Sequence, residues 1–316
     1  MLRLLLSLLL VSAVPCASAQ DTGRPIRIVV PYAAGGTTDQ VARLLQKPLS
    51  DILGQAVIVD NRPGAAGTIG TEYVARSPAD GNTLVFGNPA PSAFLPALRK
   101  TGYDPIGDFR PISTVAIMPM LLVVPTASGI VSLRDFLQRA KDKPGSINYG
   151  SSGIGSLAHL TGAQFSQRSG LGMVHIPYAG GAPMMAALFQ GDLQATFTTG
   201  LDGAAMVQSG RARYIAVASA QRDPRMPELP AITEELPGFQ SVVWFALFAP
   251  KGTPDAVANR LRGAVLAVLG QHDFRHFLEE RHAQAQGSTP EELQQRVRND
   301  IRQWSEVVKA AQIPMD

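Results

Sequence analysis

The chain has 316 residues, of which 45% are hydrophobic, and its formal net charge is +3. Such a composition can bury a sizeable core, indicates about two domains and excludes a disordered chain. Basic and acidic residues are nearly balanced and no lysine-rich face or tail is present, so nucleic acid is not an expected partner.

Residues 1–19 have the pattern of a cleaved secretory signal. A basic start at Arg3 is followed by the apolar run 4–14 and by an Ala-x-Ala site that ends at Ala19. The run is shorter than the ~20 residues that cross a bilayer, so a secreted chain that begins near Gln20 is expected. Cys16 raises the alternative of a lipid anchor, but Pro15 fits that processing poorly. Without Cys16, the only cysteine, the mature chain has no disulfide.

Strand-like apolar runs alternate with helical periodicity, which predicts mostly parallel sheets covered by helices. Side chains that can cap helices predict helix starts at Ser132, Thr253 and Thr289, and the last helix is expected to reach about Ala311. Strands are expected at 26–31, 57–60, 84–87, 121–125, 147–150, 174–178, 195–199, 214–219 and 242–249.

Two extended segments, 119–125 and 244–250, have the character of crossings between lobes. If the chain leaves one lobe at the first and returns at the second, both ends of the chain share a domain. The predicted domains are 20–122 with 246–316, and 123–245. A cleft with a two-segment hinge follows from this arrangement.

Three glycine-rich turns, at 31–39, 149–156 and 177–183, each join a strand to a helix. Thr37 or Thr38 is expected to cap the first helix, and Pro183 to occupy a first helical position. Each turn presents free N–H groups that suit a carboxylate or phosphate. A glycine after a strand commonly makes only a tight turn, but ligands of open α/β sheets bind at these strand ends.

Two cofactor or catalytic interpretations of the second turn fail on spacing. Gly153-x-Gly155-x-x-Ala158 weakly matches a dinucleotide fingerprint, but no acid occurs between Asp142 and Asp192 to hold a ribose hydroxyl. Ser151 and Ser152 lack a Gly-x-Ser-x-Gly elbow. No cofactor is therefore expected.

The histidines are assigned mainly structural roles. His159 follows the second turn and could line the site, although a hydrogen-bonded packing role is favoured. His272 and His276 have the spacing of a metal pair, but no His-Glu-x-x-His motif is present and a solvated face is preferred. No metal is expected.

The chain resembles the Bug family, the periplasmic substrate-binding components of tripartite tricarboxylate transporters. The resemblance runs from the signal to the carboxyl end. It is carried by Arg24-Pro-Ile-Arg-Ile-Val-Val-Pro-Tyr with Gly35-Gly36 and Asp39, Asp60-Asn-Arg-Pro-Gly-Ala, Asp80-Gly81, Tyr103-Asp-Pro with Asp108-Phe109, Pro144-Gly, Asn148-Tyr-Gly-Ser-Ser-Gly-Ile-Gly-Ser with His159-Leu160, His175-Ile-Pro-Tyr-x-Gly, Arg222, Trp244 and Ala249-Pro250-x-Gly252-Thr253-Pro254.

The resemblance implies a class II periplasmic binding protein fold whose turns grip a carboxylate, largely through backbone amides and ordered water. The ligand classes that fit are dicarboxylates, aromatic acids, nicotinate-like acids and amides. Tyr32, Phe86, Tyr178 and Trp244 are candidates for apolar contact, or for the core. The candidate ligand-binding residues are Tyr32, Ala33, Ala34, Gly35, Gly36, Thr37, Thr38, Asn88, Ser151, Ser152, Gly153, Ile154, Gly155, Ser156, Tyr178, Ala179, Gly180, Gly181 and Thr199.

It further implies a monomeric periplasmic receptor, not an enzyme, that presents its ligand to the membrane subunits of a transporter. A sensor that acts on a signalling partner, or a carboxylate-handling enzyme, are the alternatives. Two positions depart from the family pattern. Gln194 stands where relatives commonly have an acid, which leaves room for ligands with uncharged distal groups, and Ala231 replaces a threonine.

Overall fold

The computed structural model describes residues 23–314. The expected signal sequence, with Cys16 and the start near Gln20, lies outside the described residues. Within 23–314, no helix combines the length and the apolar character needed to span a membrane.

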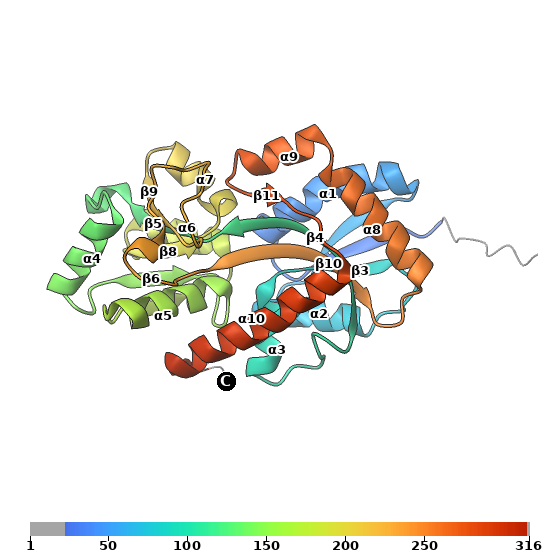
Figure 1. The fold of residues 1–316 in the computed structure, drawn as a ribbon, viewed down its shortest axis with the longest axis horizontal. Helices are drawn as coiled ribbons and strands as arrows, with labels where there is room; N and C mark the ends of the chain where they lie inside the picture. The colour runs from blue at the N-terminus through green and yellow to red at the C-terminus, as the bar shows by residue number, and fades with distance from the viewer. Residues whose placement is uncertain (1–22, 315–316) are drawn as a thin grey trace, which may run out of the picture.

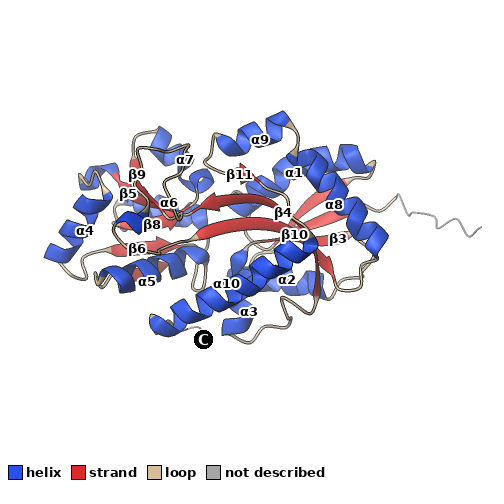
Figure 2. Cartoon of the chain, in the orientation of Figure 1, coloured by secondary structure: helices blue, strands red, loops and turns tan. Residues whose placement is uncertain are grey.

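The described residues form two β-sheets with helices packed around them (Figure 1, Figure 2). We call each sheet with its helices a lobe. The first sheet has the order β11 (Gln284–Ala285), β4 (Phe109–Pro119), β10 (Val242–Pro250), β3 (Thr83–Gly87), β1 (Ile26–Val30) and β2 (Val57–Asn61). The second has the order β7 (Val174–Pro177), β6 (Asn148–Ser151), β8 (Ala195–Thr198), β5 (Leu121–Pro125) and β9 (Ala212–Val217).

Both sheets are mixed, which corrects the expectation of mostly parallel sheets. β1 pairs in parallel with β2 and β3, and β6 with β7 and β8. The remaining pairs, which involve β4, β5, β9, β10 and β11, are antiparallel. The sheets therefore combine a parallel half with an antiparallel half that connects the lobes.

Helices cover both sheets, and the strands carry their buried side chains on both faces. The first lobe contains α1 (Thr37–Leu53), α2 (Thr68–Ala75), α3 (Leu95–Leu98), α8 (Asp255–Leu269), α9 (His272–Glu279) and α10 (Pro290–Ala310). The second contains α4 (Leu133–Asp142), α5 (Leu157–Ser169), α6 (Gly181–Gln190) and α7 (Gly200–Gln208). Short helical turns occupy Ala65–Gly67, Ala90–Phe94, Thr126–Ser128 and Ile232–Glu234.

The chain passes between the lobes at Met120 and at Ser241. Met120 N–H donates to Ser241 O at 3.1 Å, and Met120 O and Ser241 N–H both bond to Ala218. The two crossing segments are thus hydrogen-bonded to each other, whereas the predicted return crossing at 244–250 lies inside β10 of the first sheet. The expected boundaries after residues 122 and 245 fall inside β5 and β10, a few residues beyond the points where the chain changes sheet.

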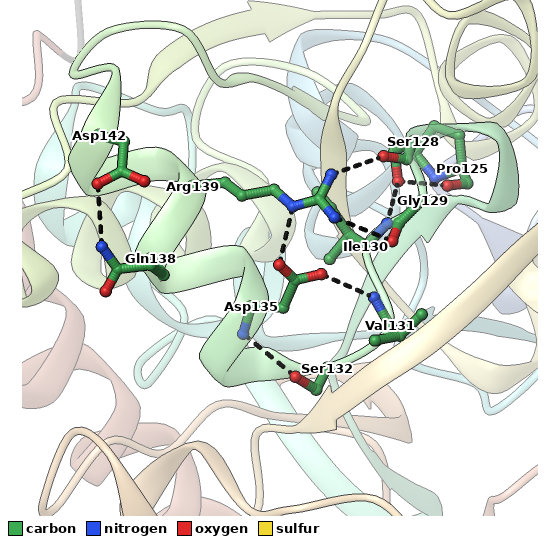
Figure 3. Close-up of polar contacts among 10 residues, drawn as sticks. All are labelled: Pro125, Ser128, Gly129, Ile130, Val131, Ser132, Asp135, Gln138, Arg139 and Asp142. Carbon is green, nitrogen blue, oxygen red and sulfur yellow. Dashed lines mark hydrogen bonds and ion pairs between the residues drawn. The ribbon is translucent and has the colours of Figure 1, made fainter.

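Two of the three predicted helix caps are confirmed. Ser132 Oγ accepts the Asp135 N–H at the start of α4, where Asp135 also binds Arg139 (Figure 3). Thr289 and Glu292 form a reciprocal capping box at the start of α10. The prediction for Thr253 is wrong, because its hydroxyl donates to Pro250 O and α8 has no side-chain cap.

Candidate functional site

A cavity of about 210 Å³ lies between the lobes, where the carboxyl ends of β1, β3 and β8 meet the hinge. Both lobes contribute to its walls. Of the nineteen candidate residues, those that line it are Tyr32, Ala33, Ala34, Gly36, Thr37, Thr38, Asn88, Ser152, Ser156, Ala179, Gly180, Gly181 and Thr199.

The other six candidates do not line the cavity. Gly35 lines a neighbouring outer hollow, and its N–H donates to Asp39 Oδ2 at 2.9 Å. The Tyr178 side chain packs on the apolar cluster of the second lobe. Ser151, Gly153, Ile154 and Gly155 belong to the β6–α5 loop but do not line the cavity.

The start of α1 is arranged differently from the prediction. Gly36 is the N-cap, and neither Thr37 nor Thr38 caps the helix. Instead the Thr37 N–H donates to Asp202 Oδ1 at 3.0 Å, and Thr37 Oγ1 lies 2.5 Å from Thr199 Oγ1. Asp202 and Thr199 belong to the second lobe. These bonds therefore connect the two lobes across the edge of the cavity.

Tyr32 and Asn88 form a polar wall in the first lobe. The Tyr32 hydroxyl donates to Asn88 Oδ1 at 3.1 Å, and Asn88 Nδ2 contacts Thr38 Oγ1 at 3.4 Å. Burial raises the pKa of Tyr32, because the charged phenolate would lose hydration. Tyr32 therefore lines the cavity as a neutral side chain.

Amides of the β6–α5 loop form hydrogen bonds with nearby side chains of the same segment. Gly153 N–H donates to Ser151 Oγ at 3.2 Å, and Gly155 N–H donates to His159 Nδ1 at 3.1 Å. Ser151 Oγ is also 2.6 Å from His175 Nε2. The expectation that these loop amides face a ligand is corrected, since they fix the shape of the loop.

His159 and His175 form a buried stack behind this loop, with ring centroids 3.7 Å apart. Burial lowers the pKa of His159 to about 4 and that of His175 to about 3, because a charged imidazole would lose its hydration. His159 accepts a hydrogen bond from the Gly155 N–H at Nδ1, so the proton of the neutral ring is on Nε2. The favoured packing role of His159 agrees with this geometry.

The starts of α5 and α6 supply main-chain donors to the second lobe's wall. The first four N–H groups of a helix have no partner inside the helix. Ser156 caps α5 by accepting the His159 N–H, which leaves the amides of Leu157 and Ala158 beside the cavity. At α6, the N-cap is Gly180, with φ at 128°. Pro183 was predicted to be the first helical residue, but it is the third residue of α6.

The apolar floor of the cavity comes from the crossing strands. Val243 and Phe245 of β10 line the cavity together with Met120. Trp244 lies between them in sequence and points to the other face of the sheet, as strand alternation requires. Phe86 is fully buried and stacks on Phe245. Of the four apolar candidates, only Tyr32 lines the cavity.

Sequence reasoning missed an acid at the site. Asp202, in the first turn of α7, is the one charged side chain among the cavity-lining residues of the described chain. Gln194, expected to replace an acid facing the cleft, lies elsewhere and accepts the Asn148 N–H at 2.9 Å. The first-turn position of Asp202, three residues after candidate Thr199, was the available signal. The other residues missed lie in or next to the predicted turns and crossings, or in the predicted strand 195–199: Met120, Leu157, Ala158, Ala182, Pro183, Met184, Phe197, Thr198, Val243 and Phe245.

The expected solvated face of α9 is present. His272 and His276 are exposed and stacked 5.7 Å apart, and they contact Asp273 and Glu280. Within 23–314, no group of three or more His, Cys, Asp or Glu side chains is arranged to hold a metal.

Comparison with known proteins places this geometry among solute receptors. Residues 41–313 match the family model described as tripartite tricarboxylate transporter family receptor. Protein BugT of Bordetella pertussis is 32% identical over 94% of this chain and 92% of its own length. A Rhodopseudomonas palustris protein solved with adipate superposes with a TM-score of 0.87 at 36% identity, covering 92% of this chain and 98% of that one. MatC of the same organism, with bound malate, superposes with a TM-score of 0.84 at 31% identity, covering 90% of this chain and 99% of that one.

Proposed function

Because the chain belongs to the tripartite tricarboxylate transporter receptor family, we propose that it binds a small carboxylate between its lobes and presents it to the membrane subunits of such a transporter. The class II periplasmic binding fold is shared with its structural neighbours. With the expected signal at residues 1–19, the proposed location is the periplasm.

One observation carries this proposal: helix starts and glycine turns from both lobes converge on a single cavity. A helix start favours a carboxylate, because its N–H groups are unpaired and the helix dipole is positive there. The titles of two structural neighbours name adipate and malate, both small acids. The cavity is lined on its other sides by Tyr32, Met120 and Phe245, which suit a short carbon chain.

The energetics of such a site are sufficient without a cationic side chain. Charge-assisted hydrogen bonds contribute about 1.5–3 kcal/mol each, so four of them contribute roughly 6–12 kcal/mol. Association costs at least about 4 kcal/mol. With apolar packing added, an affinity near micromolar, about −8 kcal/mol, is expected.

Ligand binding is coupled to closure in this proposal. Contacts across the cleft, such as Thr37 to Asp202 and Arg225 to Ala283 O at 2.7 Å, form only when the lobes approach. A ligand that touches both walls favours the closed arrangement by its differential affinity for it. The closed surface is then what a membrane partner recognises.

The test is a thermal-shift screen of small carboxylates, followed by small-angle scattering with the best ligand. We expect a subset of acids to raise the melting temperature and reduce the radius of gyration. The uncharged analogues in which every carboxylate is replaced by an amide should do neither. No stabilisation by any acid would contradict receptor function. Conversion of a bound acid to a product would support the enzyme alternative instead.

A further inference from the structure

Asp202 places its carboxyl group between two helix starts. Its Oδ1 accepts the Thr37 N–H of α1 at 3.0 Å, and a Cβ added to Gly181, at the start of α6, would lie 3.0 Å from its Oδ2. An acid in the first turn of a helix usually stabilises that helix. Here the carboxylate instead binds the helix start of the opposite lobe.

The neighbouring groups hold Asp202 in this position. Its own N–H donates to Thr199 Oγ1 at 3.2 Å, and Thr199 Oγ1 lies 2.5 Å from Thr37 Oγ1. The α1 start, which sequence analysis assigned to a ligand carboxylate, is thus already occupied by a carboxylate of the chain.

No cation compensates this charge within residues 23–314. Arg281 lines the outer hollow beside Asp202, but its guanidinium pairs with Glu280 at 3.2 Å and lies over the Phe277 ring. Burial raises the pKa of Asp202, while hydrogen bonds from Thr37 and Thr199 oppose that rise. A ligand carboxylate next to Asp202 would therefore require one of the two carboxyl groups to take up a proton, which weakens the binding of a diacid relative to an acid with a neutral hydrogen-bond donor there.

We propose that Asp202 determines specificity: the cavity takes an acid with one carboxylate, held at the α5 start, whose distal end is neutral and donates a hydrogen bond to Asp202. This inference rests on the proposed receptor function and narrows its ligand class. Leu157, Ala158 and Ser152 line the cavity on this side, and their two amides and the hydroxyl are donors for the carboxylate.

The experiment compares matched pairs of acids on the wild-type protein and on Asp202→Asn by titration calorimetry. The two acids of a pair have the same chain length and differ only in that one carboxylate is replaced by an amide. The pairs are succinate with succinamate, and adipate with adipamate. We expect the wild type to bind the mono-amide at least tenfold more tightly than the diacid. Asp202→Asn keeps an oxygen for the Thr37 N–H but loses the charge, so diacid affinity is expected to rise at least tenfold and the preference to disappear.

Asp192→Asn is the control, because Asp192 is an exposed acid of the same lobe. It should leave the preference unchanged. If acids bind but Asp202→Asn does not alter the ratio of amide to diacid affinity, the inference fails and the receptor function stands. If no acid of either pair binds either protein, the receptor proposal fails and the inference with it.

Discussion

At the scale of single residues, His159 positions the loop that precedes α5. It accepts the Gly155 N–H through Nδ1 and stacks on His175, which in turn contacts Ser151. His159 and Gly155 are both buried, so little water can reach the Gly155 amide to replace a lost acceptor. The ligand wall therefore depends on a residue that does not line the cavity.

Substitutions of His159 distinguish its role as a hydrogen-bond acceptor for Gly155 from its role in packing. His159→Leu fills space but leaves the Gly155 N–H unpaired, which should cost about 1–3 kcal/mol of unfolding free energy and weaken ligand binding. His159→Asn retains an acceptor near the position of Nδ1 and should recover most of the affinity. Chemical denaturation and calorimetry measure both effects. Equal affinities for the two variants would contradict the positioning role.

Asp300 predicts a pH dependence of stability. It accepts the Trp244 indole N–H at 2.6 Å, and burial raises its pKa to about 6. The folded state therefore holds this proton more tightly than the unfolded state, so the unfolding free energy falls as pH rises from about 4 to 6. Because Asp300 borders an open hollow, solvent screening reduces this effect. The expected fall in unfolding free energy is about 1–2 kcal/mol.

Asp300→Asn keeps an acceptor for Trp244 and should remove this component of the pH dependence. The measurement is the unfolding free energy by denaturant at several pH values between 4 and 7. Arg296, the charged neighbour that lowers this pKa, stays in both proteins. Identical slopes for the variant and the wild type would contradict the assignment.

At the scale of elements, most strands could be predicted because their apolar runs are short and bounded by turn residues. The predicted strand at 26–31 is β1 at Ile26–Val30, and that at 242–249 is β10 at Val242–Pro250. The 11-residue β4 was missed. Its Ser113 and Thr114 interrupt the apolar pattern, and both side chains are satisfied by Ser288, a contact that no local pattern reveals.

The helix caps also divide into those that local sequence predicts and those that tertiary contacts decide. Ser132 and Thr289 were predictable because an N-cap bond spans three residues. The start of α1 was not, because the partner of Thr37 is 165 residues away in the sequence. Local chemistry identified the helix, but tertiary structure decided what its free amides bind.

The capping box of α10 gives an element-scale prediction. Thr289→Ala removes the acceptor for the Glu292 N–H and should lower the unfolding free energy by about 1 kcal/mol. Thr289→Asp, which retains a capping oxygen, should stay within a few tenths of the wild type. Denaturant unfolding compares the three proteins. An alanine variant as stable as the wild type would show that tertiary packing alone holds this helix start.

At the scale of the whole molecule, the lobes approach each other closely at Gly200. A Cβ at this position would lie 2.2 Å from the Arg281 carbonyl oxygen, which belongs to the other lobe. The sequence suggested two lobes and a cleft, but it gave no sign that this glycine, outside the three glycine-rich turns, sits at the rim. Absence of a side chain at Gly200 is thus a condition for closure.

Gly200→Ala should hold the lobes apart. We expect a larger radius of gyration with ligand than in the wild type and at least tenfold weaker binding, with little loss of stability. Gly263→Ala is the matched control, since nothing lies within 4 Å of an added Cβ there. If Gly200→Ala binds and contracts like the control, the rim contact has no part in closure.

The most direct test of the account is a crystal structure of the protein with a carboxylate found by the screen. The predicted result has the carboxylate oxygens within hydrogen-bonding distance of main-chain amides at the α5 or α6 start, with the lobes closed over the ligand. A carboxylate held by a cationic side chain elsewhere, with those helix starts free of ligand, would contradict it.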